Sequence, residues 1–200
     1  MTDSALRTFR SAILGACLLM LSACGINSVP TAEEAAKARW ADVQAQYQRR
    51  ADLVPNLVAT VKGAAQAEKE TLTAVIEARA RATSVQVSTD DLNDPAKVAQ
   101  FAAAQGALSQ SLGRLLLTVE RYPDIKFNQN FQDLQVQLEG TENRIATAII
   151  KYNEAVQAYN VRVRTFPDMI GAMIRGLKPM TPYQATSPNA QQAPQVDFGA

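Results

Sequence analysis

Residues able to take part in chemistry are few, and the most reactive ones lie near the start of the chain. Both cysteines, Cys17 and Cys24, fall within the first 24 residues, and the 200-residue chain contains no histidine. This excludes Ser–His–Asp triads, histidine general bases and nearly all common zinc or non-haem iron sites. Ser109 has no base to activate it, and Glu139 and Glu142, on one helix face, indicate surface carboxylates. We expect no catalytic residue, no cofactor and no metal.

The segment before Cys24 has the three parts of a secretory signal. Arg7 and Arg10 form a positively charged start, residues 11–23 are mostly apolar, and small residues precede the cysteine. About thirteen residues of helix span about 20 Å, which is short of the roughly 30 Å hydrocarbon core of a bilayer. A cleaved signal over residues 1–23 is therefore favoured over a helix that spans the membrane.

The run from Leu21 to Cys24 resembles the bacterial lipoprotein signal. The resemblance implies that the Cys24 sulfur receives a diacylglyceryl group, that cleavage precedes this cysteine, and that the new amine is acylated. A second match ends at Cys17, but only six residues separate it from Arg10, too few for the apolar part of a signal. A plain cleaved signal with a chance cysteine is the alternative. In a Gram-negative host, Gly25 favours the periplasmic face of the outer membrane.

The rest of the composition indicates a helical domain without a strong charge. The apolar fraction is 47% and the aromatic fraction 6%, with abundant alanine, which favours long helices over a β-sandwich. Lys and Arg number 20 and Asp and Glu 19, so loss of Arg7, Arg10 and Asp3 with the signal leaves 18 of each. A neutral chain argues against nucleic acid as a partner. Attachment to a membrane is left to the acyl chains on Cys24.

Apolar residues recur at helical spacing in three stretches separated by turn-forming residues. The expected helices cover residues 31–82, 95–121 and 128–165. Thr31 has the sequence context of an N-cap, and Trp40 is expected in the core. Pro55 predicts a kink in the first helix because proline removes a backbone hydrogen bond.

Three such helices can bury their apolar stripes only against one another. We predict an all-α fold: an antiparallel up-down bundle of three long helices over residues 31–178, with a short C-terminal helix near residues 169–177. Residues 24–30 are expected to form the anchor and a spacer. Residues 179–200 contain four prolines and no periodicity, and we expect a disordered tail.

Polar and charged residues gather in two places of the expected bundle. They are Arg50, Asp52 and Asn56 in the first helix, and Asn130, Glu142, Asn143 and Arg144 in the third. A charge near a helix seam loses water, and a partner on the facing helix offsets this cost. We expect at least one charge pair to join the two helices near Pro55. The alternative is an outward docking surface for a partner.

Two Tyr-Asn pairs, at residues 152–153 and 159–160, lie seven residues apart in the third expected helix. Asparagine at heptad spacing beside a core can fix the register between helices. The alternative is a polar groove for a partner peptide or a ligand.

Several of these runs together resemble the signature of the LemA family. They are residues 47–63, 120–123, 128–131, 138–145, 152–153, 159–160 and 166–167. The likeness spans about residues 26–180 and implies long antiparallel helices in an up-down bundle, with the N-terminus at a bacterial membrane. It implies no activity, since the family has no generally established biochemical function, although some relatives are linked to magnetosome membrane formation. Many relatives have Tyr and His where this chain has Ala64 and Ala67, so no histidine-dependent role transfers.

We therefore expect a lipid-anchored helical-bundle protein of the cell envelope. It would act as a binding or scaffold module without catalytic activity, with another envelope protein as its partner. The alternative is a structural protein whose exposed seam assembles copies at the membrane. An enzyme or a metal-binding protein is the least favoured class.

Overall fold

The structure, a computed structural model, describes residues 2–62 and 68–184, with side chains from Asn27 onward. Within these ranges every regular element is helical, as the sequence predicts. The helices are α1 (Thr2–Lys62), α2 (Lys69–Ser84), the 3₁₀ turn η2 (Thr89–Asp91), α3 (Pro95–Val119), α4 (Pro123–Lys126), α5 (Gln129–Arg164) and α6 (Asp168–Ile174). No helix in the described part is long and apolar enough to cross a membrane.

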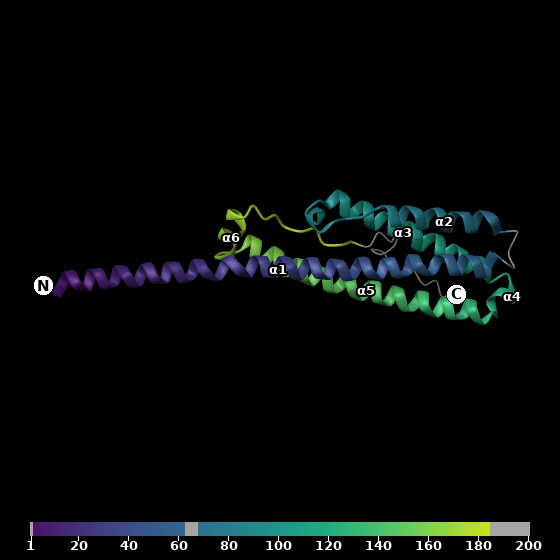
Figure 1. Cartoon of the computed structure of the whole chain (residues 1–200), viewed down its shortest axis with the longest axis horizontal. Helices are drawn as coiled ribbons and strands as arrows, with labels where there is room; N and C mark the ends of the chain where they lie inside the picture. Colours follow the sequence, from purple (N-terminus) through teal and green to yellow (C-terminus); the bar gives the residue numbers. More distant parts are fainter. Residues whose placement is uncertain (1, 63–67, 185–200) are drawn as a thin grey trace, which may run out of the picture.

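The four long helices lie along one axis and alternate in direction (Figure 1). α1 runs toward the end where α4 lies, α2 returns, α3 runs out again and α5 returns. α1 packs against α5 and α2, and α2 packs against α3. The first part of α1 projects beyond the bundle, and α6 lies at the end from which it projects (Figure 1).

The expected single helix over residues 31–82 is wrong, because it is two helices that fold back on each other. The sequence between Val61 and Leu72 contains no large apolar side chain, so the stripe that would hold a continuous rod is interrupted there. A reversal after Lys62 lets α2 bury Leu72 and Val75 in the same apolar cluster as Val61. The bundle has four long helices in its described part instead of three.

Pro55 lies inside α1 and removes one main-chain hydrogen bond, but the helix continues through it. α1 remains helical through this residue and shows no sharp bend (Figure 1), so the kink expected there is wrong. Because proline has no N–H, the carbonyl of Ala51, four residues earlier, lacks its helical donor. Arg79 of α2 provides the missing donor, because its Nε donates to the Ala51 carbonyl at 2.8 Å. The proline thereby provides an acceptor that attaches α2 to α1.

α1 also continues through residues 27–30, where a spacer was expected. Thr31 is not an N-cap, because its hydroxyl donates to the Asn27 carbonyl at 2.8 Å within the helix. Val29 is fully buried in the core. The packed bundle therefore begins in the region assigned to the spacer.

Buried apolar residues form two clusters, one toward each end of the bundle. The cluster nearer α6 is centred on Trp40, which is fully buried as expected and has Phe101 and Tyr152 with ring centroids 5.3 and 5.1 Å away. The cluster toward α4 contains Leu57, Leu108 and other aliphatic residues of α1, α2, α3 and α5.

The chain after α6 is ordered further than expected. Gly176, with φ of 66°, ends α6 in the left-handed conformation that glycine adopts most easily, and the following residues run back along the bundle (Figure 1). Met180 and Tyr183 are buried, so residues 179–184 of the expected disordered tail are packed. The rest of that expected tail, residues 185–200, lies outside the described residues.

Candidate functional site

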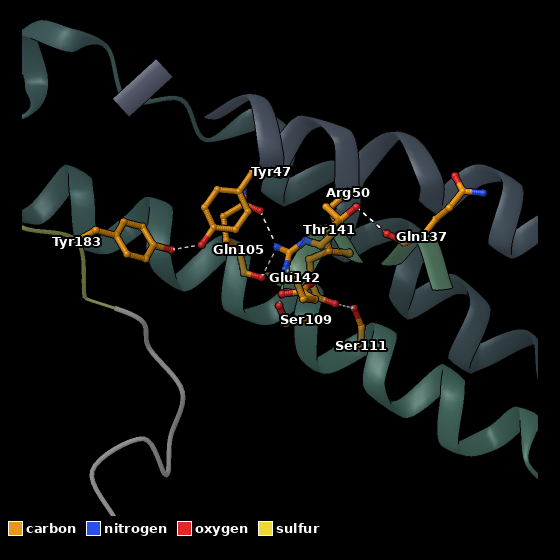
Figure 2. Close-up of polar contacts among 10 residues, drawn as sticks. Tyr47, Arg50, Gln105, Ser109, Ser111, Gln137, Thr141, Glu142 and Tyr183 are labelled. Atoms are coloured by element: carbon orange, nitrogen blue, oxygen red, sulfur yellow. Dashed lines mark hydrogen bonds and ion pairs between the residues drawn. The ribbon is translucent and has the colours of Figure 1, made fainter. Parts of the chain in front are cut away.

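Arg50 occupies the centre of a group of polar contacts (Figure 2), which lies between the two apolar clusters along α1. We call this the Arg50 layer, and it consists of Arg50, Gln105, Ser109, Thr141 and Glu142. On α1 it follows Tyr47 of one cluster and precedes Val54 of the other. The Arg50 side chain is only 1% exposed. A charge at this depth needs acceptors, which the other helices supply.

The guanidinium of Arg50 has hydrogen-bond acceptors on two other helices (Figure 2). Its Nη1 donates to Ser109 Oγ at 2.6 Å and to Glu142 Oε1 at 2.9 Å. Its Nη2 donates to the main-chain oxygen of Gln105 at 3.0 Å and to the side-chain Oε1 at 2.9 Å. The carbon between these nitrogens lies 5.0 Å from the ring centroid of Tyr47, a cation–π contact. The Nε of Arg50 is buried without a hydrogen-bond partner.

Gln105 extends the layer to α2. Its Nε2 donates to the carbonyl of Ala82 at 3.0 Å while its Oε1 accepts from Arg50. Thr141, fully buried on α5, satisfies its hydroxyl by donating to the Gln137 carbonyl at 2.7 Å. The layer thus joins all four long helices. The hydrogen bonds of Arg50 and Gln105 run between helices, so the arrangement aligns them.

The ion pair of the layer is asymmetric in its exposure. Arg50 is buried, whereas the side chain of Glu142 is 49% exposed. The carboxylate keeps part of its hydration, which lowers the cost of placing a charge pair at a helix seam. This is the pair between the first and third expected helices that the sequence led us to look for, and it lies five residues before Pro55.

The other residues of the two sequence clusters are not brought together. Those on the surface are Asp52, Asn56, Asn130, Asn143 and Arg144. Asp52 accepts a hydrogen bond at 2.7 Å from Gln48 on its own helix, and Arg144 reaches Thr141 on its own helix at 3.4 Å. The expected internal network therefore contains Arg50 and Glu142 alone, and the remaining five face solvent.

A second constellation on α5 holds the C-terminal segment, by which we mean residues 178–184. Asn153 donates from Nδ2 to the Tyr183 carbonyl at 3.0 Å and accepts from the Tyr183 N–H at 2.8 Å. Asn160 makes the same two bonds with Met180, both at 2.8 Å. Each asparagine therefore pairs with both main-chain groups of one residue, as a neighbouring β-strand would. We call Tyr152, Asn153, Tyr159 and Asn160 the Tyr–Asn clamp.

The tyrosines of the clamp bind the same segment. Tyr152 donates to the Thr181 carbonyl at 2.9 Å, and Tyr159 donates to the Lys178 carbonyl at 3.0 Å. The hydroxyls of Tyr47 and Tyr183 lie 2.6 Å apart. Burial raises the pKa of Tyr152, Tyr159 and Tyr183 above the ordinary value. These hydroxyls therefore stay protonated at neutral pH.

The spacing of the clamp matches the segment it holds. Seven helical residues between Asn153 and Asn160 rise about 10.5 Å. Three extended residues between Met180 and Tyr183 span about 10 Å. The heptad asparagines do not set the register between two helices. They line a polar groove on α5, and the peptide in that groove belongs to the chain itself.

Sequence reasoning missed Gln105 and the C-terminal segment, for different reasons. Gln105 interrupts an apolar stripe between Phe101 and Leu108, as Arg50 does on α1, and a polar residue at a core position is a usable signal. Residues 178–184 show no periodicity that indicates burial. In the part of the chain that the structure describes, no group of three or more His, Cys, Asp or Glu could hold a metal ion.

The fold and its polar groups define an elongated helical bundle with a buried charged layer and a self-bound C-terminal segment. The family described as the LemA family matches residues 39–198, which include the Arg50 layer and the Tyr–Asn clamp. The chain therefore belongs to the LemA family.

Part of the chain is similar to curated proteins named as magnetosome proteins. Magnetosome protein MamQ 2 and Magnetosome protein MamQ 1 of Paramagnetospirillum magneticum are each 36% identical to this chain over 75 residues. Magnetosome protein MamQ of Magnetospirillum gryphiswaldense is 33% identical over 75 residues. Each alignment covers 38% of this chain but only 28% of the relative. Family membership and these relatives together indicate a membrane-associated helical protein.

Proposed function

We propose that the chain is a lipid-anchored scaffold of the bacterial cell envelope that presents a rigid helical body to an envelope protein and has no catalytic activity. The observation that supports this best is the continuity of α1. Cys24, the expected acylation site, lies on α1 among residues whose side chains are not described, and Val29, five residues later, is fully buried.

This continuity matters because it determines how an anchor acts on the bundle. Five helical residues rise about 7.5 Å, so the first core contact follows the acylated position within about one and a half turns. A flexible spacer would attach the bundle to the membrane without orienting it. A helix transmits the direction of the anchor to the body, as a scaffold requires.

The interior supports the non-catalytic part of the proposal. The charge of Arg50 is used in joining three helices, and the tyrosine hydroxyls of the clamp are used in holding the C-terminal segment. Groups that an enzyme would direct at a substrate are here directed at other parts of the fold.

Lipidation is tested in cells with a labelled fatty acid. We expect the label to enter the wild-type chain and Cys17→Ala but not Cys24→Ala. The Cys24→Ala chain should stay unprocessed or leave the membrane fraction. Loss of label in Cys17→Ala alone would show that Cys17, not Cys24, is the acylated residue. Absence of label from the wild type and both variants would refute the lipid anchor.

The scaffold role is tested by photo-crosslinking in intact cells from Asn143, which is exposed on α5. A reproducible adduct with one identified envelope protein supports the proposal. Adducts of the chain with itself would favour a self-assembling structural protein instead. A crosslinker at Asn56, exposed on α1, provides a second position in case the partner does not contact Asn143.

A further inference from the structure

α6 lies at the end of the bundle from which α1 projects (Figure 1), and it exposes an apolar face there. Five large apolar side chains in and just before this helix are between 36% and 78% exposed: Phe166, Met169, Ile170, Met173 and Ile174. We call them the α6 patch. Single exposed apolar residues are ordinary on a protein surface, but five within nine residues form a concentration that calls for a partner.

The patch faces outward because the opposite side of α6 is fixed in the bundle. α6 packs against α1 and α5, with Gly171 and Ala172 buried on that side. An ion pair at 3.6 Å between Arg162 of α5 and Asp168 fixes the start of the helix. The apolar side chains are therefore held away from the core by a firmly packed helix.

Basic residues flank the patch in the sequence. They are Arg162, Arg164, Arg175 and Lys178, and Asp168 is the one acidic residue in residues 162–178. The chain as a whole is close to neutral, so this excess is local. Apolar side chains with flanking Lys and Arg are the combination that places a helix in the headgroup region of an anionic bilayer.

The position of the patch identifies the bilayer as its occupant. The apolar residues 11–23 and the expected acylation site, Cys24, lie toward the N-terminal end of α1, and this end projects from the bundle where α6 lies (Figure 1). Whether the chain is held by acyl groups or by residues 11–23 themselves, the membrane lies at the α6 end of the bundle. The patch thus lies at the end of the bundle where the proposed anchorage places the bilayer.

We infer that α6 is a second membrane contact, whose apolar face inserts into the anionic surface of the bilayer that anchors α1. The inference rests on the proposed membrane anchorage and adds a second attachment to it. The anchor constrains the direction of the bundle through α1, and a second contact at the same end adds a further constraint on its tilt.

The test uses the full chain with one added cysteine. Met173→Cys, in a Cys17→Ala background, is labelled with an environment-sensitive fluorophore and reconstituted into vesicles of phosphatidylethanolamine and phosphatidylglycerol. Leu117→Cys is the matched control, because Leu117 and Met173 are both 73% exposed and Leu117 lies near the α4 end. We expect the label at Met173 to shift its emission to the blue and to be quenched at least twofold more by nitroxide lipid than the label at Leu117.

The outcomes separate this inference from the proposed function. Without an added cysteine, the Cys17→Ala chain should take up no label if Cys24 is acylated, and uptake would refute the lipid anchor independently of α6. Equal quenching at the two positions, in chains that remain in the vesicles, would refute the contact by α6 alone. A blue shift at Met173 that grows with protein density and resists nitroxide lipid would overturn it in favour of a second copy covering the patch.

Discussion

Arg50 illustrates what a buried charge requires at the scale of a single residue. Its guanidinium has four acceptor contacts, to the side chains of Ser109, Glu142 and Gln105 and to the Gln105 main chain. The half-exposed Glu142 neutralises the charge while remaining in contact with water. Because α3 and α5 provide the acceptors and α1 carries Arg50, the guanidinium can be satisfied only when all three helices are in register.

Replacing Arg50 should therefore cost far more than replacing its neighbour. Removing one member of a buried charge network typically costs about 3–5 kcal/mol, and we expect Arg50→Ala to lose this much stability. Arg49→Ala, at an exposed position one residue earlier, should lose less than about 0.5 kcal/mol. Urea unfolding followed by circular dichroism gives both values. Equal losses for the two arginines would show that the Arg50 layer does not stabilise the fold.

Glu142 and Asp52 provide a finer comparison of two acidic residues. Glu142→Gln keeps a hydrogen-bond acceptor for Arg50 but removes the charge, and we expect a loss of about 1 kcal/mol or more. Asp52→Ala, which removes only a contact with Gln48 on the same helix, should lose well under 1 kcal/mol. If the stability losses of Glu142→Gln and Asp52→Ala add in the double variant, the two residues act independently. Strong coupling between the losses would place Asp52 in the network with Arg50.

Among single residues, the sequence was informative about position and less so about partners. Arg50 and Gln105 each interrupt an apolar stripe, so their burial is readable from spacing. That Arg50 binds Ser109 and Glu142 depends on which faces of α3 and α5 meet it, and this follows from the packing of the whole bundle. Asp52 and Asn143 belong to the same polar clusters in the sequence, but they face solvent because they lie on a different side of their helices from the apolar stripe.

At the scale of elements, the Tyr–Asn clamp explains how residues without helix or strand become part of the core. A segment packed beside a helix exposes main-chain groups that need partners. Asn153 and Asn160 provide them to Tyr183 and Met180, and the Thr181 N–H donates to the Leu92 carbonyl at 2.7 Å. The segment therefore bridges α5 and the turn before α3.

Replacing either asparagine of the clamp with aspartate should destabilise the fold, because the amide donor to the C-terminal segment is lost. Asn153→Asp keeps the acceptor for the Tyr183 N–H but turns the donor into an oxygen that faces a carbonyl. We expect a loss of about 1–3 kcal/mol for Asn153→Asp, and a similar loss for Asn160→Asp. Asn143→Asp, exposed on the same helix, is the control and should change stability little. Unchanged unfolding in the clamp variants would mean that the segment is held by apolar contacts alone.

Truncation tests the whole segment at once. Ending the chain after Lys178 removes the buried Met180 and Tyr183, worth about 1.5–3 kcal/mol each, and we expect the melting temperature to fall by roughly 10 °C. Ending it after Gln184 removes no contact that the structure describes and should change the melting temperature by less than about 2 °C. If both truncations melt together, the segment contributes nothing and the tail predicted from sequence begins at Pro179.

The elements themselves were predictable to the extent that periodicity marks them. The spacing of apolar residues located α3 and α5 within a few residues. It also joined α1 to α2, because apolar residues resume at helical spacing from Leu72 onward whether or not the chain reverses in the gap after Val61. The role of Pro55 was misread for a related reason. A proline removes a hydrogen-bond donor in any helix. That the freed Ala51 carbonyl accepts a hydrogen bond from Arg79 can be seen only in the packed structure.

At the scale of the whole molecule, the buried tyrosines link stability to alkaline pH. Burial raises the pKa of Tyr47, Tyr152, Tyr159 and Tyr183 in the folded chain. In the unfolded chain these groups titrate near pH 10, so the unfolded state loses protons first. The stabilising effect is complete below about pH 10 and is lost as the pH rises through the folded pKa values.

Titration of tyrosinate absorbance measures this directly. We expect the absorbance of the folded protein to rise at a higher pH than that of the urea-unfolded protein, and to rise together with the loss of helix. The denaturant midpoint should be steady from about pH 7 to 9 and then fall. Tyr159→Phe should reduce the alkaline fall. Tyrosinate forming near pH 10 while the helices remain intact would show that these hydroxyls are open to solvent.

The unbroken α1 makes the molecule a spacer of fixed length. Lys62 lies 38 residues beyond Cys24, and at about 1.5 Å per residue this is about 57 Å of helix. Because α5 packs along α1 and the Arg50 layer ties both to α3, the column cannot shorten by sliding without unpairing a buried charge. With the proposed anchor on Cys24, a protein bound near α4 would be held about that far along the column from the membrane. Rotation of the column about its axis would carry that protein with it as one rigid body.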